Sequence, residues 1–455
     1  MGKNARQTLK HMTTTITHSA TSLTGLLMLS ILSLNANADA NGSDELRQMP
    51  EESVFSRTLR FQGDVVEVLP SGKIIRKRAL IRGKRFEWAG EVAGRVAEIR
   101  EDVTAAERAP DIDSISVEEL AENLRGIALF NGHQFIEAEP PLKLAQQVKA
   151  LRELERRGAS GQELEQMLPG TSASQGTAAP TVDLLQTERG EFDAKRDEDT
   201  RIVHGNDDRR VMNNRVYPHR THIVFDNAGS TSSINGAQGS GTLIGPSTAM
   251  SVAHVFWHEA NNTWESTHRW APGFDSQDSD PSPYGEWYGC YWVTIPTAYT
   301  IYESTTYDYA VLDFDVGCNS VRNGVNSDNP GSSVGWLGNY TASASSIESR
   351  GGYMRGYPGN GTCGNPGTSC NVRVWGDYSS SSENDATSNT IRHQADSSGG
   401  QSGSAFYHYA DPSCGGCGYG AYLVGMHRAG YTSYNQARRY TSTVRSFMKS
   451  YSSDY

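Results

Sequence analysis

The sequence has no apolar run of bilayer length and no excess of positive charge. Its longest apolar run, Leu23 to Leu34, has about a dozen residues, whereas a helix that spans a membrane needs about 20. The 455 residues carry a formal net charge of −11, which argues against an electrostatic affinity for nucleic acid or for anionic lipid. We therefore expect a globular protein with another class of partner.

The short apolar run gives the N-terminus the pattern of a secretory signal peptide. Lys3, Arg6 and Lys10 precede the run, and an Ala-Asn-Ala motif that ends at Ala38 follows it. A basic stretch, a short apolar core and an A-x-A site are typical of such a peptide, and the alternative is a membrane anchor. We expect residues 1–38 to be removed and the mature protein to be secreted, either outside the cell or into the periplasm.

Cysteine is absent before Cys290. The six cysteines all lie in the C-terminal half, and in an exported chain they are candidates for disulfide bonds. We favour sequential pairing, because two of the three pairs would each close a glycine-rich loop. The alternative for the CGGC stretch is a redox or zinc pair, although no second CxxC motif accompanies it. The candidates are Cys290, Cys318, Cys363, Cys370, Cys414 and Cys417.

Two regions of different composition follow the signal peptide. Residues 39–168 are rich in charge, and apolar residues recur at helical spacing within 116–126 and 142–167, after a strand-forming stretch. This indicates an α+β region. Residues 169–201 are small, polar and charged, without periodicity. Such a composition is typical of an exposed linker that proteases can cleave.

The remaining residues, 202–455, show a different pattern. About ten short alternating stretches lie between Gly, Pro, Asn and Ser turns, which predicts an all-β antiparallel barrel or sandwich. A terminal helix is expected over residues 442–449. A signal peptide, a pro-region at 39–168, a cleavable linker and a β-domain are together the parts of a secreted zymogen.

Three separate stretches supply the side chains that an activated serine needs. A serine hydroxyl is a weak nucleophile and needs a base, a group that orients the base, and donors for the developing oxyanion. Ser402 lies in GGQSGS, His254 ends SVAH, and Asp308 opens DYAVLDF. Each alone has a structural explanation, as a loop, a core histidine or a turn aspartate. Together, at expected strand ends and in the order His, Asp, Ser, they predict a hydrolase.

Around these residues, from about Ile202 to Lys449, the chain resembles the trypsin-like (chymotrypsin-fold) serine peptidases. TLIGPSTAMSVAH, YDYAVLDFD and GGQSGSAFY are similar to the family's histidine, aspartate and nucleophile segments. The bacterial glutamyl endopeptidases are the more similar branch, because Val255 follows the histidine, GGQSGS replaces GDSGGP, and IVHGNDDRRVMNNRVYP is similar to their mature N-terminus. The resemblance implies a double six-stranded antiparallel β-barrel with the active site between the barrels.

The resemblance also implies a role for each residue. Ser402 would attack the scissile carbonyl, His254 would carry the proton to the leaving amine, and Asp308 would orient the imidazole. The backbone N–H groups of Gly400 and Ser402 would form the oxyanion hole. The chain departs from the family at Ala405, where proline is common, and in a long stretch between the histidine and the aspartate.

The resemblance implies a preference for acidic substrates as well. His427, in VGMH, and Ser397 match the residues that receive a substrate carboxylate in glutamyl endopeptidases, and such donors form charge-assisted hydrogen bonds. A pocket for Lys or Arg would need an acid instead, and Asp396 is the nearby candidate. Arg428 adds positive charge beside the histidine. We expect cleavage after Glu or Asp, with another specificity as the alternative.

Activation is expected at the end of the linker. Cleavage between Arg201 and Ile202 would create a new N-terminus like the one that completes the pocket in this family. An enzyme with Glu preference does not cut readily after Arg201, so either a separate activating protease or self-cleavage at Glu191 or Glu198 with trimming is required. The expected partners are protein or peptide substrates, the activating protease, and the pro-region as inhibitor or folding aid. We expect a monomer without cofactor or metal.

Three other interpretations use some of the same residues. An α/β-hydrolase esterase would use Ser402, Asp411 and His427, but GSAFYHYADPSCGGCGYG after the serine does not suit the helix of a nucleophile elbow. A zinc site would use His254 and His258, but the HExxH motif is absent. A catalytically silent binding protein on the protease fold is the third alternative, although all three catalytic positions are filled.

Overall fold

The computed structural model describes most of the chain after residue 77. All the described residues belong to one compact unit, Gln48–Tyr455. The predicted signal peptide, the predicted linker, and both Arg201 and Ile202 lie outside them. Within the part of the chain that is described, no helix is both long and apolar enough to cross a membrane. The described residues are 78–81, 84–91, 109–130, 133–159, 207–229, 232–258, 263–265, 268–314, 329–339, 341–359, 362–363, 368–409, 420–431 and 433–455.

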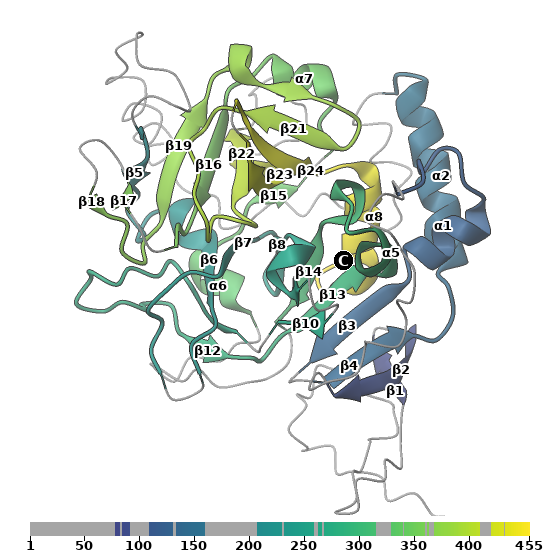
Figure 1. The fold of residues 1–455 in the computed structure, drawn as a ribbon, viewed down its shortest axis with the longest axis horizontal. Coiled ribbons are helices and arrows are strands. Elements are labelled where there is room, and N and C mark those ends of the chain that lie inside the picture. The colour runs from purple at the N-terminus through teal and green to yellow at the C-terminus, as the bar shows by residue number, and fades with distance from the viewer. Residues whose placement is uncertain are drawn as a thin grey trace, which may run out of the picture. The chain divides into compact units, whose positions relative to one another are not determined.

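The larger of the two main sheets has 11 strands in the order β1-β2-β4-β3-β13-β14-β8-β7-β6-β11-β12, and each neighbouring pair is antiparallel (Figure 1). Residues 78–159, which we call the N-terminal segment, supply four of these strands. The strands are β1 (Arg78–Ile81), β2 (Lys84–Glu91), β3 (Gly126–Phe130), β4 (His133–Glu137), β6 (His222–Asp226), β7 (Gly239–Leu243), β8 (Thr248–Ser251), β11 (Arg269–Pro272), β12 (Trp287–Tyr288), β13 (Trp292–Pro296) and β14 (Ala310–Asp313).

The second main sheet comes wholly from residues after 207. Its order is β20-β21-β24-β23-β22-β16-β19-β5, with antiparallel neighbours, and β15 joins β23 in parallel. Two short hairpins, β9 with β10 and β17 with β18, lie outside the main sheets. The bounds are β5 (Arg210–Val211), β9 (Trp257–His258), β10 (Thr263–Trp264), β15 (Gly338–Asn339), β16 (Gly352–Gly356), β17 (Thr362–Cys363), β18 (Thr368–Ser369), β19 (Trp375–Ser379), β20 (Asp385–Ala386), β21 (Thr390–His393), β22 (Ala405–Tyr409), β23 (Ala421–Gly430) and β24 (Asn435–Arg439).

The two antiparallel sheets confirm the predicted all-β class. Their strand numbers, 11 and 9, differ from the six strands expected for each barrel. In the first sheet, four of the 11 strands, β1 to β4, come from the N-terminal segment, because the backbone groups of β3 continue the hydrogen-bonded ladder at the edge of β13. A segment expected to be a separate α+β piece therefore extends the first sheet, because an open strand edge accepts any strand of matching register.

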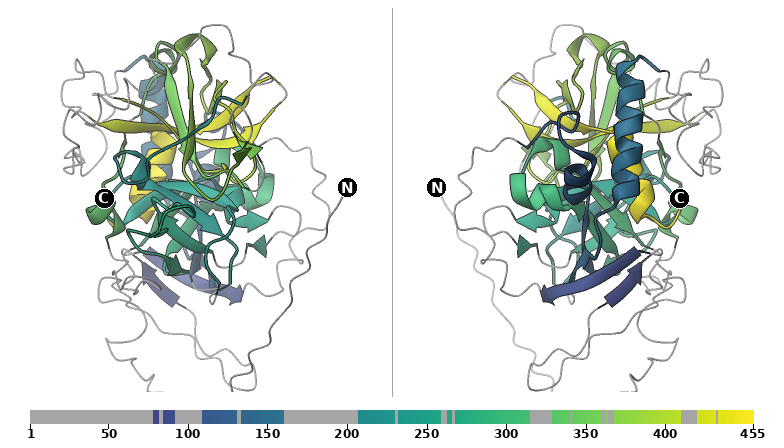
Figure 2. Two further views of the ribbon diagram at one scale, coloured as in Figure 1. Left: turned by 90° about the vertical axis from the view of Figure 1, so that its left-hand side faces the viewer. Right: turned by 90° about the vertical axis from the view of Figure 1, so that its right-hand side faces the viewer.

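Within the described part of the chain, the helices are few, and α2 is the longest. α2 has its apolar face, Leu144, Val148 and Leu151, buried as its spacing predicts, and it lies alongside α8 (Figure 2). The end of the predicted helix beyond residue 159 lies outside the described residues. The helices are α1 (Val117–Asn123), α2 (Leu142–Arg156), α5 (Thr297–Tyr302), α6 (Pro330–Val334), α7 (Ala344–Glu348) and α8 (Ser442–Tyr451), with 3-10 turns η1 (His219–Thr221), η2 (Ala253–Val255), η4 (Thr305–Tyr307) and η5 (Ser381–Glu383).

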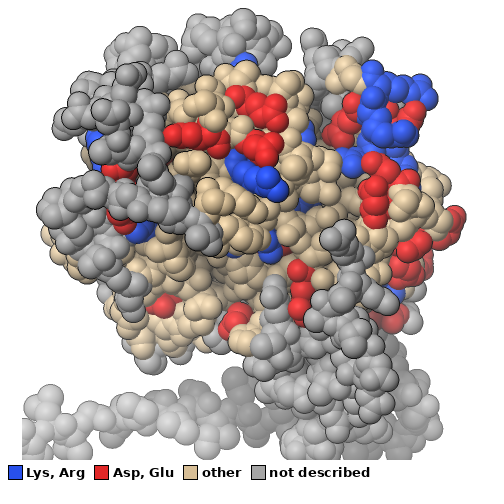
Figure 3. Space-filling model, turned by 45° about the horizontal axis from the view of Figure 1, so that its top comes forward, with Lys and Arg blue, Asp and Glu red and all other residues tan. Residues whose placement is uncertain are grey.

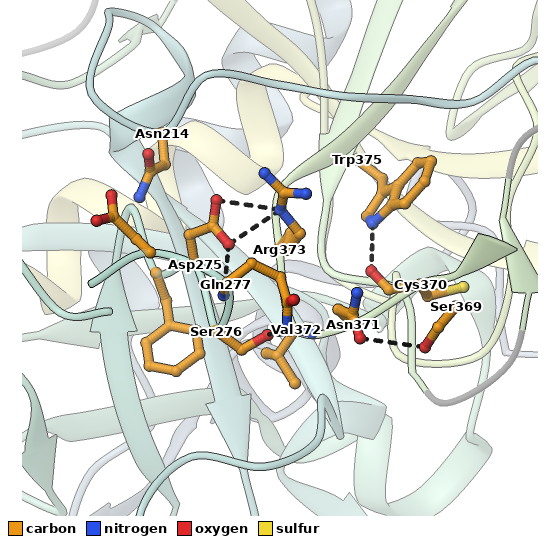
Figure 4. Close-up of polar contacts among 12 residues, drawn as sticks. Asn214, Asp275, Ser276, Gln277, Ser369, Cys370, Asn371, Val372, Arg373 and Trp375 are labelled. Atoms are coloured by element: carbon orange, nitrogen blue, oxygen red, sulfur yellow. Dashed lines mark hydrogen bonds and ion pairs between the residues drawn. The ribbon is translucent and has the colours of Figure 1, made fainter. Parts of the chain in front are cut away.

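A polar contact joins the loop after β11 to the segment before β19 (Figure 4). Arg373 Nε donates to Asp275 Oδ2 at 3.0 Å, and the Ser276 N–H donates to the Val372 carbonyl at 2.9 Å. Because β11 belongs to the first sheet and β19 to the second, these bonds connect the two sheets. On the face in Figure 3, most of the described surface is neutral, and acidic and basic side chains lie in a few clusters that contain both signs.

Candidate active site

Two adjacent strands bring His254 and Asp308 together. β8 is antiparallel to β14, and Ser251 at the end of β8 pairs with Ala310 at the start of β14. His254 lies in η2, just after β8, and Asp308 lies between η4 and β14. Since the end of one strand meets the start of its antiparallel neighbour, residues 54 positions apart come into contact.

His254 connects Asp308 to Ser402 through its two ring nitrogens. Nδ1 lies 2.9 Å from Asp308 Oδ2, and Nε2 lies 2.7 Å from Ser402 Oγ. The backbone N–H of His254 also donates to Asp308 Oδ1 at 3.2 Å. The Asp308 side chain is fully buried, whereas 23% of the His254 side chain is exposed. The three residues form one hydrogen-bonded chain that reaches solvent at the histidine.

Arg428 joins this chain in a way that the sequence did not indicate. Its Nε donates to Asp308 Oδ2 at 3.0 Å, the same oxygen that faces His254, and its Nη1 lies 3.2 Å from Gln436 Oε1. Burial by itself would raise the pKa of Asp308, but His254 and Arg428 outweigh it and hold that pKa well below its usual range. From the sequence, Arg428 was visible only as a charge beside His427, because the contact spans 120 residues.

Ser402 lies in a tight loop before β22. Gly400 and Gly403 have φ of +88° and +86°, in the left-handed region that favours glycine, and a Cβ atom on Gly400 would overlap the backbone nitrogen of Gly359. Ser240 anchors the loop: its N–H donates to the Ser402 carbonyl at 2.7 Å and its hydroxyl to the Gly400 carbonyl at 3.0 Å. The glycines of GGQSGS are thus required by conformation and by packing.

The backbone N–H groups of this loop differ in whether they are bonded within the protein. The Gln401 N–H donates to the Ser398 carbonyl at 3.1 Å, and the Gly403 N–H donates to the His427 carbonyl at 2.7 Å. The N–H groups of Gly400 and Ser402, by contrast, have no acceptor among the described residues. These two are the donors that the family resemblance implied.

A cavity of about 400 Å³ opens beside Ser402, and Ser397 and His427 both line it. Ser397 Oγ donates to Asn435 Oδ1 at 2.9 Å. His427 Nδ1 lies 3.4 Å from His393 Nε2. The residues singled out for substrate binding are therefore brought to the same cavity as the serine.

His427, which lines this cavity, and its buried neighbour His393 are neutral near pH 7. Burial, and then the neighbouring His393, lower the pKa of His427 well below its ordinary value. Burial lowers the pKa of His393 to about 3. A neutral imidazole donates one hydrogen bond but carries no charge. Among the residues that line the cavity, Arg428 is the one with a permanent positive charge.

Asp396, the acid that a basic pocket would need, has other contacts. Its Oδ2 accepts the Asp208 N–H at 2.8 Å, and its own N–H donates to Asp377 Oδ2 at 2.8 Å. Burial, followed by the charge of Asp377, raises the pKa of Asp396 to about 7. A carboxyl group that is partly protonated near neutrality is a weak counter-ion for a Lys or Arg side chain.

Arg209 is a second site residue that sequence reasoning missed. Its Nη1 donates to Ser398 Oγ at 2.6 Å and to Gln401 Oε1 at 2.8 Å, and an ion pair joins it to Asp207. The guanidinium thereby holds two side chains of the nucleophile loop from outside the loop. The available signal was the run Asp207-Asp208-Arg209, which the sequence presents only as part of the family resemblance.

The described residues test only a small part of the prediction that the six cysteines form disulfide bonds. Cys290 and Cys370 are in the disulfide-bonded state, and no bond between two described side chains fixes the pairing. In the β17–β18 hairpin, Cys363 pairs with Thr368, two positions from Cys370. The side chain of Cys363 and the residues Cys318, Cys414 and Cys417 lie outside the described part, so sequential pairing stays a prediction.

The residues of the alternative sites are also partly located. His254, one of the two histidines of the zinc alternative, has both ring nitrogens in the chain from Asp308 to Ser402. Among the residues that the structure describes, no group of three or more His, Cys, Asp or Glu is arranged to hold a metal ion. Asp411, which the esterase alternative needs, lies outside the described residues.

Two curated bacterial proteins are similar to this chain in sequence. The chain is 28% identical over 247 residues to a glutamyl endopeptidase of Bacillus licheniformis, and 26% identical over 243 residues to a Bacillus subtilis protein named extracellular metalloprotease. Each match covers 53% of this chain and 66% of the relative. The chain thus spans just under two thirds of the length of the curated relatives it matches. No family model matches the sequence.

Solved structures with some likeness to the chain are proteases as well. A Glu endopeptidase in complex with MPD is 21% identical, with a TM-score of 0.40, over 55% of this chain and 98% of that chain. A thermostable serine protease from an extremophilic microorganism is 14% identical, with a TM-score of 0.34, over 51% of this chain and 97% of that chain. The sequence match to a glutamyl endopeptidase confirms the resemblance to the trypsin-like serine peptidases that the motifs indicate.

Proposed function

We propose that this protein is a serine endopeptidase with Ser402, His254 and Asp308 as its catalytic triad. The observation that carries the proposal is the bridging position of His254, with Nδ1 2.9 Å from Asp308 Oδ2 and Nε2 2.7 Å from Ser402 Oγ. An imidazole held in this way takes the serine proton as the hydroxyl attacks a peptide carbonyl, and returns it to the leaving amine.

The tetrahedral intermediate of this reaction needs donors for its oxyanion. The N–H groups of Gly400 and Ser402 have no acceptor among the described residues and suit this role. A preorganised donor of this kind lowers the barrier by about 3–4 kcal/mol. Their loop is fixed by Ser240, so little reorganisation is needed as charge develops.

The substrate class that we propose has Glu or Asp before the scissile bond. Ser397 and the neutral His427 line the cavity beside Ser402. Because His427 Nδ1 faces His393, Nε2 is the nitrogen left to donate to a substrate carboxylate. The permanent charge of Arg428 favours an acidic side chain as well. The name of the Bacillus licheniformis relative, glutamyl endopeptidase, supports this preference.

We further propose the maturation scheme that the sequence indicates. A signal peptide, residues 1–38, would direct secretion, and the word extracellular in the name of the Bacillus subtilis relative supports that location. Residues 39–168 would form a pro-region and 169–201 a linker. A separate protease, or self-cleavage with trimming, would expose Ile202 as the new N-terminus of a disulfide-bonded peptidase domain.

The test is a comparison of the wild type with Ser402→Ala on matched peptides that differ only in the residue before the scissile bond: Glu, Asp, Gln or Lys. Loss of the nucleophile lowers kcat by about 10⁴-fold or more, and Glu peptides are cleaved fastest by the wild type. Circular dichroism shows that the variant is folded. Hydrolysis by the variant at the wild-type rate contradicts the triad.

A zinc chelator in the same assay tests a second candidate function. The relative named a metalloprotease motivates that candidate. We expect hydrolysis by this protein to resist 1,10-phenanthroline and to be abolished by a fluorophosphonate that labels Ser402. The reverse pattern would support the metalloprotease.

A further inference from the structure

The N-terminal segment is built into the first sheet rather than resting on its surface. Leu129, Ala128 and Ile127 of β3 pair with successive residues of β13, and all five residues of β3 are buried. Without the segment, β13 would have an unpaired edge and its neighbours would lose a covered face. An exposed edge of this kind invites aggregation.

Side chains of both parts share one apolar core across this junction. Phe130 stacks on Trp292 with ring centroids 4.6 Å apart, and Phe135 lies 5.3 Å from the same indole. Trp264 Nε1 donates to Gln134 Oε1 at 3.0 Å. The apolar surface covered here comes from the C-terminal part of the chain, so departure of the segment would expose it to water.

A buried polar contact at α8 closes the junction. Tyr451 donates its hydroxyl to the Leu124 carbonyl at 3.2 Å and also contacts the Glu137 carboxylate at 2.5 Å. The Gly126 N–H donates to the same carboxylate at 3.3 Å. Buried groups that lose such partners remain unsatisfied, which is costly. The junction is therefore held by strand pairing, ring packing and buried hydrogen bonds together.

The segment reaches the catalytic region without entering the cavity. Asn123 Nδ2 donates to the hydroxyl of Tyr307, the residue before Asp308, at 3.4 Å, and the Thr297 N–H donates to the Arg125 carbonyl at 2.8 Å. Among the described residues that line the cavity beside Ser402, none comes from the segment. The segment can thus support the aspartate side of the site while substrate has access to the serine.

We propose that the N-terminal segment stays bound after the linker at 169–201 is cut and is a second, non-covalent chain of the active enzyme. The inference rests on the proposed function in one respect: the proposed maturation scheme supplies the cut in the linker. It assigns the segment a permanent structural role, whereas an inhibitory pro-region would leave the enzyme. The surface that the segment occupies is the β13 edge together with α8, in the C-terminal part of the same chain.

The experiment uses the full chain with Ser402→Ala and a recognition sequence for a site-specific protease inserted in the linker. After the cut, native mass spectrometry and size-exclusion chromatography at nanomolar concentration should find both pieces in one complex. A folded C-terminal piece that elutes alone overturns the proposal. The result is independent of activity, because the variant lacks the nucleophile, so failure of the proposed function leaves this readout intact.

A matched pair of tyrosine variants tests the junction itself. Tyr451→Phe removes the hydroxyl that contacts Leu124 and Glu137, whereas Tyr455→Phe removes one that donates to the Ile244 carbonyl at 2.8 Å within the C-terminal part. We expect the cut pieces to dissociate about tenfold faster in Tyr451→Phe and at the wild-type rate in Tyr455→Phe. Equal rates in all three proteins overturn the assigned surface.

Discussion

Arg428 and His254 both contact the same oxygen of Asp308, so two partners hold the aspartate at one atom. The distances to Oδ2 are 3.0 Å and 2.9 Å, while Oδ1 accepts the His254 backbone N–H. A fully buried carboxylate is costly unless it is paired. The arginine therefore supplies both the compensating charge and a fixed orientation for the group that orients the base.

Replacement of Arg428 by Gln tests this role. Loss of one charge-assisted bond, about 2 kcal/mol, should lower kcat/KM by about 30-fold. The pKa of Asp308, which is held below its usual range, should rise. The ionised Asp308 contributes to the free energy of unfolding in full above the pKa of an ordinary carboxyl group. This contribution is lost as the pH falls through the lower pKa that Asp308 has in the folded protein. Acid unfolding of the variant should therefore begin at a higher pH, as thermal melts at stepped pH would measure.

A double-mutant cycle controls for a general packing defect. In the Asp308→Asn background the carboxylate charge is gone, so Arg428→Gln should add little further loss of stability. An equally large effect in both backgrounds would show that the arginine acts through packing.

Asp396 carries a pH effect of the opposite sign. Burial, and then Asp377, raise its pKa to about 7, so the folded state favours the neutral form. Its stabilising contribution is complete below the ordinary carboxyl pKa, about 4, and is lost as pH rises through about 7. Asp396→Asn, whose amide oxygen still accepts the Asp208 N–H, should be stabilised relative to the wild type on the order of 2 kcal/mol more at pH 8 than at pH 5.

Urea unfolding at the two pH values measures this difference. The exposed Asp385, which pairs with Arg392 at the surface, provides the control: Asp385→Asn should show the same pH dependence as the wild type. A parallel shift of Asp396→Asn at both pH values would contradict the assigned titration.

The nucleophile loop contains two adjacent glycines with different environments. Gly400 has φ +88° and no room for a Cβ atom, whereas Gly399 has open space around it. Gly400→Ala should displace the oxyanion donors and lower kcat by about 10²–10³-fold, and Gly399→Ala should stay within about threefold of the wild type. Steady-state kinetics on one Glu peptide would measure kcat for both variants and the wild type. Equal losses would mean that the whole loop is sensitive to substitution.

The sequence was informative where the signal is local. The helix with Leu144, Val148 and Leu151 follows from apolar spacing over about two turns, and the loop around Ser402 follows from its glycines. The contact of Arg428 with Asp308 and that of Arg209 with Gln401 span 120 and 192 residues. No local pattern encodes them, because each depends on how distant strands come together in the fold.

Because local patterns do not encode distant contacts, the sequence also did not show that the N-terminal segment joins the first sheet. The composition of residues 39–168 separates them from the β-domain, and nothing in the order of residues shows that β3 pairs with β13. The bond from Tyr451 to Leu124 closes a span of 327 residues. The entropic cost of closing a loop rises only slowly with the length of the loop. The continuous chain can therefore keep the two parts together during folding.

Refolding kinetics should reveal this dependence. After denaturation in urea with disulfides intact, the uncut chain should regain native tryptophan fluorescence at a rate independent of protein concentration, because its two parts are tethered. The same chain cut in the linker must bring two molecules together, so its rate should fall in proportion to dilution. The uncut protein with the identical inserted sequence is the control. If the cut protein refolds at one rate over a hundredfold range of concentration, the C-terminal part folds without the N-terminal segment, and the shared sheet is then an accessory to folding.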